Sequence, residues 1–257
     1  MFTPSYSLWT PLFSSSPTTC YQKARKQTKR KLKVLPLNCN GLKGSNKQAE
    51  FHTLVELHQP DVILGRESKI DPSIPTSSIF WDKYKMFRKD RTASGGGVFI
   101  ATRNDLTALR EPRFDVGDCL NQIVTASLQF SRTKKLYIAS FCNPSATDPG
   151  PLELLDEYLS KLYNHSKFPQ LTLGGYFNCI GINWPNLQLH LQLPVHICDR
   201  VLLELVDKFG LTRHVRWPTC LDRTLDLAFS SLPNTISACH VTTGISDYEA
   251  VLFEVEA

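Results

Sequence analysis

The sequence lacks the features that mark a membrane, secreted or zinc-binding protein. No apolar run approaches the ~18–20 residues that a helix needs to cross a bilayer. The eight cysteines include no Cys-x-x-Cys pair and form no cluster with histidine at zinc-ligand spacing. The first twenty residues have neither the charged start nor the continuous apolar stretch of a secretory signal. We therefore expect no membrane partner, and free thiols in a reducing compartment.

Acidic side chains are absent from residues 1–33, whereas residues 23–33 (KARKQTKRKLK) hold seven lysines or arginines. Residues 34–257 have 22 basic and 24 acidic side chains, so the positive charge belongs to one end of the chain. This distribution predicts a flexible basic tail over residues 1–31 and a folded domain over residues 32–257. Because such a run attracts phosphate groups of any sequence, we expect DNA affinity to fall sharply when residues 1–31 are removed. The candidate contacts in the tail are Lys26, Lys29, Arg30 and Lys31.

The remaining sequence has ordinary globular composition, with 42% hydrophobic and 21% charged residues overall. Short β-rich runs alternate with stretches of helical periodicity, and no internal repeat is present. Strands outnumber helices, and hairpins occur beside helical crossovers, which favours a sheet sandwich flanked by helices. The predicted helices lie around 51–57, 151–163 and 198–209. The predicted strands lie at 34–38, 61–67, 96–102, 121–130, 135–141, 170–175, 224–231, 237–244 and 249–256.

Polar residues follow the apolar part of four of these segments, namely LNCNGL (37–42), ILGRESK (63–69), LGGYFN (173–178) and GISDYEAV (244–251). Strand ends are where such folds carry their sites, because the strands fix positions while the loops vary. Carboxylate and amide oxygens are the ligands that a hard cation such as Mg²⁺ prefers. For any one segment taken alone, a simple turn is the favoured explanation of the polar residues, since Asn and Asp suit turns.

The order of the segments is more specific than any one of them. The series Asn-x-Asn-Gly-Leu, Glu-Ser-Lys, RKDRTASGGGVFIA, Gly-Gly-x-Phe-Asn, Leu-Asp-Leu and Ser-Asp-x resembles the endonuclease/exonuclease/phosphatase superfamily. Within it, the chain looks most like the apurinic-type endonuclease domain of non-LTR retrotransposons, over nearly all of residues 32–257. The resemblance implies a four-layered α/β sandwich with the deoxyribonuclease-I-like fold. It also implies hydrolysis of phosphodiesters with Mg²⁺, or Mn²⁺ as an alternative, and no small-molecule cofactor.

The resemblance also assigns roles to residues of this chain. Glu67 matches the principal metal ligand, and Asn40 and Asp247 lie near the same ion. Asn38 and Asn178 match the residues that hold the scissile phosphate and the attacking water. Asp226 matches the residue that orients the histidine of a Ser-Asp-His motif.

Two positions depart from the family pattern. The family's Asp in Gly-Gly-Asp-Phe-Asn is Tyr176, and its His in Ser-Asp-His is Tyr248. A phenol has an ordinary pKa of about 10, so neither side chain readily accepts a proton at neutral pH. Losing one positioned acid or base typically costs about 10²–10⁴ in rate. The substitution at 248 leaves Asp226 without its expected partner. Two softer departures are the loop Phe141-Cys142-Asn143-Pro144, which lacks the tyrosine and the basic residue that the family usually has there, and Cys220, where the family commonly has arginine.

Two interpretations fit these departures. In the first, the chain is an endonuclease domain of retrotransposon origin with impaired catalysis. A decayed copy of the retrotransposon is favoured over a fold that a host has kept, because each substitution is a single-base change. In the alternative, it is a non-catalytic module that binds nucleic acid or protein. A hydrolase of another phosphoester is a third interpretation, which the GGGVFIA and GISDYEAVLFEV segments disfavour.

DNA is the expected partner, with RNA as an alternative, and a monomer is expected. Arg88, Lys89 and Arg91 precede the glycine run and are candidate contacts to a nucleic-acid backbone, with a hairpin of solvated charges as the equal alternative. A nuclear or cytoplasmic location is expected, and mitochondrial targeting by the acid-free tail stays open.

Overall fold

The computed structural model describes residues 31–92, 95–116, 122–132, 134–191, 193 and 195–256. Three predicted tail contacts, Lys26, Lys29 and Arg30, lie outside these residues. The fourth, Lys31, is the first residue of strand β1 (Lys31–Asn38), and its Nζ atom donates a hydrogen bond to Glu254 at 2.8 Å. The first strand therefore begins one residue before the predicted start of the domain.

Strand β1 lies inside a six-stranded sheet with the order β13-β14-β1-β2-β4-β3. Strands β1 and β2 pair in parallel, as a crossover through helix α1 requires, and β14 and β4 pair antiparallel on either side of them. Both β1 and β2 are buried almost throughout, which explains their continuous apolar sequences. The remaining elements of this half are α1 (Ser45–His58), β2 (Val62–Arg66), β3 (Tyr84–Lys89), β4 (Val98–Arg103), β13 (Ile236–Thr242) and β14 (Ala250–Glu256).

A second six-stranded sheet has the order β11-β12-β8-β7-β6-β5. Its parallel pair is β7 and β8, joined by helix α2, whose Pro lies in the first turn as the sequence predicts. Helix α3 and a small hairpin, β9 with β10, follow β8. The elements are β5 (Ala108–Arg110), β6 (Ile123–Gln129), β7 (Lys135–Cys142), α2 (Gly150–His165), β8 (Gln170–Tyr176), β9 (Ile182–Asn183), β10 (Gln188–Leu189), α3 (Ile197–Lys208), β11 (Thr212–Arg213) and β12 (Asp226–Ser230). Short 3₁₀ turns cover Thr76–Ser78 and Pro112–Phe114.

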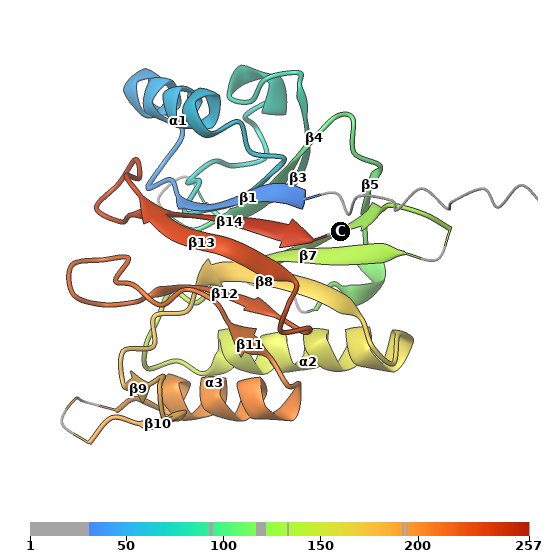
Figure 1. The fold of residues 1–257 in the computed structure, drawn as a ribbon. Helices are drawn as coiled ribbons and strands as arrows, with labels where there is room; N and C mark the ends of the chain where they lie inside the picture. The colour runs from blue at the N-terminus through green and yellow to red at the C-terminus, as the bar shows by residue number, and fades with distance from the viewer. Residues whose placement is uncertain are drawn as a thin grey trace, which may run out of the picture.

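The two sheets pack face to face, with α1 on the outer face of the first sheet and α2 and α3 on the outer face of the second (Figure 1). Three buried clusters fill the gaps between these layers: one between α1 and its sheet, one between the sheets, and one under α2 and α3. The predicted four-layered α/β sandwich is thereby confirmed. No helix in the described part of the chain has the length and apolar character needed to span a bilayer.

The glycine pair near the end of β8 is required by close packing on both sides. A Cβ atom on Gly174 would lie 2.6 Å from Cδ1 of Leu64 on the opposite sheet. A Cβ atom on Gly175 would lie 2.2 Å from the carbonyl oxygen of Phe141 in the neighbouring strand. A side chain at position 174 would push the two sheets apart, and one at position 175 would displace the neighbouring strand β7, so both positions require glycine.

Candidate functional site

The ends of the central strands of both sheets meet at one edge of the sandwich (left in Figure 1). In the first sheet, Asn38 at the end of β1 is paired with Arg66 at the end of β2. In the second sheet, Tyr176 at the end of β8 is paired with Cys142 on β7 and with Asp226 on β12. The thiol of Cys142 lies 3.6 Å from Oε1 of Glu67, which joins the two sets. The fold thus gathers most of the predicted site residues at one place.

Three of the predicted site residues have a left-handed backbone. The φ angles are 44° at Asn40, 53° at Glu67 and 53° at Asn178, and none of these residues is glycine. Such conformations cost of order 1–3 kcal/mol each and persist where the surrounding structure imposes them. Five further described non-glycine residues share this conformation, and asparagine adopts it more readily than most residues, so Glu67 is the unusual member of the three.

The Glu67 carboxylate is held by groups on two sides. Its Oε2 atom accepts a hydrogen bond from the backbone N–H of Gly96 at 3.2 Å, and its Oε1 atom faces the Cys142 thiol. Burial raises the pKa of Cys142, so this thiol stays neutral and acts as a donor. The glycine run approaches closely because Gly96 and Gly97 have φ angles of +77° and +88°. The backbone N–H groups of Ser68 and Lys69 bond to these glycines and fix the loop that carries Glu67.

Asn40 and Asp247 line one surface cleft of about 720 Å³, together with Lys47 and Glu50. Asp247 is exposed, and Oδ1 of Asn40 accepts a hydrogen bond from Nζ of Lys69 at 2.5 Å. Glu67 does not line this cleft, but its carbonyl oxygen accepts a hydrogen bond from Gly41, beside Asn40, at 2.8 Å. Glu67 and Asn40 therefore belong to adjacent loops, and Asn40 shares its cleft with Asp247.

The oxygen donors of Glu67, Asn40 and Asp247 are of the kind that a hard cation takes, although Glu67 lies outside the cleft that the other two line. Among the described residues, no group of three or more His, Cys, Asp or Glu side chains comes together as a metal centre. Two carboxylates and an amide are nonetheless enough for Mg²⁺, which commonly keeps several waters and takes only one or two carboxylates from the protein. Oxygen donors of this kind disfavour a soft metal. Lys69 would have to leave Asn40 for that amide to act as a ligand.

The two predicted phosphate-holding asparagines differ in environment. Asn38 is buried, and its Oδ1 atom accepts the backbone N–H of Asn40 at 3.0 Å, which fixes the turn after β1. Asn178 is half-buried and follows Phe177, whose carbonyl oxygen accepts a hydrogen bond from Nδ2 of Asn143 at 2.9 Å. Asn38 therefore shapes the loop, whereas Asn178 presents its side chain nearer to solvent.

Tyr176 and Tyr248 face each other. Their hydroxyl oxygens are 3.4 Å apart, and their rings meet edge to face with centroids 5.5 Å apart and an angle of 85°. Burial raises the pKa of Tyr176 and also raises the pKa of Tyr248. Both phenols are therefore neutral at neutral pH. The two substituted positions form one contact pair beside Asp226.

Asp226 has a partner that the sequence did not reveal. The sequence leaves Asp226 unpartnered, whereas the structure pairs its Oδ1 atom with Nη2 of Arg66, and both side chains are fully buried. Burial raises the pKa of Asp226, and the charge of Arg66 opposes this effect. The local sequence feature that could have indicated this partner is an arginine in the otherwise apolar segment VILGR.

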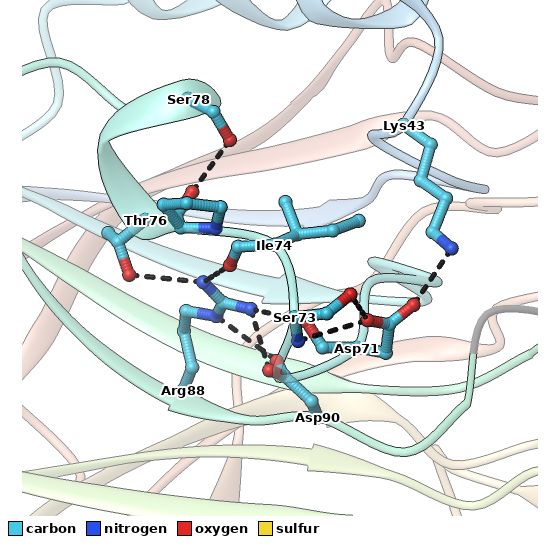
Figure 2. Close-up of polar contacts among 9 residues, drawn as sticks. Lys43, Asp71, Ser73, Ile74, Thr76, Ser78, Arg88 and Asp90 are labelled. Carbon is cyan, nitrogen blue, oxygen red and sulfur yellow. Dashed lines mark hydrogen bonds and ion pairs between the residues drawn. The ribbon is translucent and has the colours of Figure 1, made fainter.

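Arg88, a predicted contact to nucleic acid, is instead part of an internal network (Figure 2). Its guanidinium donates to both carboxylate oxygens of Asp90, at 3.1 and 2.6 Å, and to the carbonyl oxygen of Ile74 at 2.9 Å. It also bonds to the Oγ1 atom of Thr76 at 3.0 Å and the carbonyl oxygen of Asp71 at 3.3 Å. These contacts fix residues 71–76 on strand β3, so Arg88 anchors a loop.

The other two basic residues of that group differ from Arg88. Lys89 is half-buried at the end of β3, and Arg91 is exposed beside the glycine run. Arg91 is therefore the best placed of the three to meet a phosphate.

The two packed sheets and the flanking helices define the class: the chain has the deoxyribonuclease-I-like fold that it shares with several solved structures. Solved structures that share this fold include the endonuclease domain of TRAS1, a telomere-specific non-LTR retrotransposon, at a TM-score of 0.65 and 15% identity over 88% of this chain and 99% of that one. An AP endonuclease from Leishmania major matches with a TM-score of 0.71 and 13% identity, over 89% of this chain and 88% of that one. An AP endonuclease from Archaeoglobus fulgidus matches with a TM-score of 0.67 and 13% identity, over 88% of this chain and 100% of that one. Neither a family model nor a curated protein sequence matches the chain.

Proposed function

We propose that this chain is a DNA endonuclease domain of retrotransposon origin whose phosphodiester hydrolysis depends on magnesium and is impaired. The observation that carries the proposal is the contact between Tyr176 and Tyr248 at the strand ends. There, two neutral phenols stand where the family resemblance expects an acid and a histidine. The residues that the resemblance assigns to the metal, Glu67, Asn40 and Asp247, are retained in the sequence.

The metal side of the site supports hydrolysis. Glu67, with Asn40 and Asp247, would hold Mg²⁺, or Mn²⁺, which supplies charge neutralisation at the scissile phosphate when bound. Within the chain, the Gly96 N–H and the Cys142 thiol orient the Glu67 carboxylate without neutralising it. Asn178, half-buried just after β8, would donate hydrogen bonds to a phosphate oxygen.

The proton-transfer side supports impairment. A neutral phenol donates a hydrogen bond to a phosphate oxygen but does not take a proton from water at neutral pH. Burial raises the pKa of Tyr176 further, so even less of its ionised, basic form is present at neutral pH. Losses of about 10²–10⁴ are typical for one such group, and two groups that act together need not add. We therefore expect slow residual nicking at most.

A second candidate is a non-catalytic module that binds nucleic acid. The observation that favours it is the hydrogen bond from Nζ of Lys69 to Oδ1 of Asn40, because this bond occupies the oxygen that a metal ion would need. DNA is the proposed partner in either case, with RNA as an alternative. A monomer in the nucleus or cytoplasm is proposed for both.

Supercoiled-plasmid nicking in magnesium separates the candidates. The chains to compare are the natural one, Tyr176→Asp/Tyr248→His, and that double variant with Glu67→Ala. If the double variant nicks the plasmid, the natural chain does not, and Glu67→Ala abolishes the nicking, the result supports the impaired endonuclease. Equal nicking by the natural chain and the double variant overturns the impairment. DNA binding without nicking in all three supports the module.

A further inference from the structure

The two sheets are joined beneath the tyrosine pair by one buried ion pair. Arg66 ends β2 in the first sheet, and Asp226 begins β12 in the second. Both side chains have zero exposure, and Nη2 of Arg66 contacts Oδ1 of Asp226. Within the described part of the chain, Nε and Nη1 of Arg66 and Oδ2 of Asp226 have no hydrogen-bond partner. Each group is therefore the main compensation for the other's buried charge.

Asp226 also lies directly beside the tyrosine pair. It is the cross-strand neighbour of Tyr176 in the β8–β12 register, and the Tyr176 hydroxyl touches that of Tyr248. Besides Tyr176, the groups near enough to act on the Tyr248 hydroxyl include Cys220, Asp226 and Arg66. Asp226 is thus a buried carboxylate close to position 248, and it is already bound to an arginine.

We propose that Arg66 is a third determinant of the impaired site: it positions Asp226 toward the opposite sheet and withholds it from residue 248. This inference rests on the proposed function. Because guanidinium is permanently charged and the pair is shut off from water, turning Asp226 toward a new partner would leave Arg66 buried without compensation. A histidine placed at 248 would then lack the carboxylate that orients its ring. Restoring the residues at 176 and 248 is therefore insufficient for full activity.

A nuclear magnetic resonance experiment tests this without any nuclease assay. The full chain carrying Tyr248→His is labelled with ¹⁵N-histidine, and the introduced imidazole gives the one signal absent from the natural chain. We expect no strongly downfield ring N–H proton, the signature of a bond to a buried carboxylate, while Arg66 is present. Adding Arg66→Gln should make it appear, whereas adding Arg66→Lys, which keeps the charge, should not. A downfield proton with Arg66 intact, or none after Arg66→Gln in a folded chain, overturns the proposal.

Where Arg66→Gln prevents folding, a crystal structure of the Tyr248→His chain decides instead. Asp226 bound to Arg66 supports the proposal, and Asp226 bound to the introduced imidazole overturns it.

A nicking assay then separates this inference from the proposed function. Adding Arg66→Gln to Tyr176→Asp/Tyr248→His should raise the nicking rate at least about tenfold. If the downfield proton appears but nothing nicks, the role of Arg66 stands and the endonuclease proposal fails. If the double variant nicks and Arg66→Gln changes neither the rate nor the signal, the endonuclease proposal stands and the role of Arg66 fails.

Discussion

Arg66 and Asp226 form an ion pair with no solvent exposure, and it spans the gap between the two sheets. The two residues are 160 positions apart in the sequence. Together with the hydrogen bond from the Ser140 hydroxyl to the Gly65 carbonyl at 3.1 Å, the pair fixes the sheets against each other under the candidate site. The site is therefore built on a buried polar contact as well as on apolar packing.

Removing one member of this pair should destabilise the fold far more than removing both. Arg66→Met or Asp226→Leu alone should lower the free energy of unfolding by about 3–5 kcal/mol, because each leaves a buried charge without a partner. Arg66→Met/Asp226→Leu removes both charges and should lie much closer to the natural chain. Urea unfolding of the four chains gives the coupling energy. Simple additivity of the two single losses would contradict a direct pair.

Arg88 and Arg91 should respond oppositely to the same substitution, although they are only three positions apart. Arg88→Ala removes the contacts that fix residues 71–76 and should cost about 2–3 kcal/mol of stability. Arg91→Ala, at an exposed position, should leave stability unchanged and weaken DNA binding. Thermal unfolding and DNA titration of both variants measure the contrast. A stable Arg88→Ala chain with lost DNA affinity would restore the sequence-based assignment.

The stability of the domain should fall on mild acidification because of His214. Burial, with the nearby charge of Arg216, lowers the pKa of His214 to about 4, and its ring lies 2.8 Å from the Ser230 hydroxyl. The unfolded chain takes up this proton near the ordinary histidine pKa of about 6.5 and the folded one only near pH 4, so stability falls as the pH drops through this window.

At pH 5 the loss assigned to His214 should be about 1–2 kcal/mol, after allowing for partial exposure of the ring. His214→Gln keeps a polar partner for Ser230 and should remove that loss. The measurement is urea unfolding at about pH 7 and about pH 5, with His240→Gln as the exposed control. An unchanged difference between the two pH values in His214→Gln would contradict this role.

The basic tail should supply much of the salt-dependent attraction to DNA. The structure places Lys31 in β1 against Glu254, so the deletion to test is residues 1–30, which carries Lys23, Arg25, Lys26, Lys29 and Arg30. Each lost phosphate contact should reduce the slope of log K against log salt by roughly 0.9. Binding curves at several salt concentrations measure this slope, with Lys31→Ala as the control that leaves it unchanged. An equal slope before and after deletion would refute a role for the tail.

The sequence was sufficient to predict the layers of the fold, and it also predicts where a site would lie. Leucine spacing in 151–163 and 198–209 predicts α2 and α3, and their apolar faces bury as expected. The polar residues after 34–38, 61–67 and 170–175 predict an edge site, because parallel strands end on one side of a sheet. Periodicity and strand-end polarity are local properties, so they can be read along the chain.

The burial and the partners of individual charged side chains could not be predicted from these local patterns. Arg66 and Arg88 each end or nearly end a strand, and nothing in their neighbours distinguishes a buried arginine from an exposed one. Their roles depend on strand register and on how the two sheets pack, which bring Arg66 to Asp226 and residues 71–76 to Arg88. The sequence by itself determined the order of strands and helices and the chemistry available at the edge. Only the tertiary structure decided which charges face each other, since burial makes partner choice a property of the packed sheets.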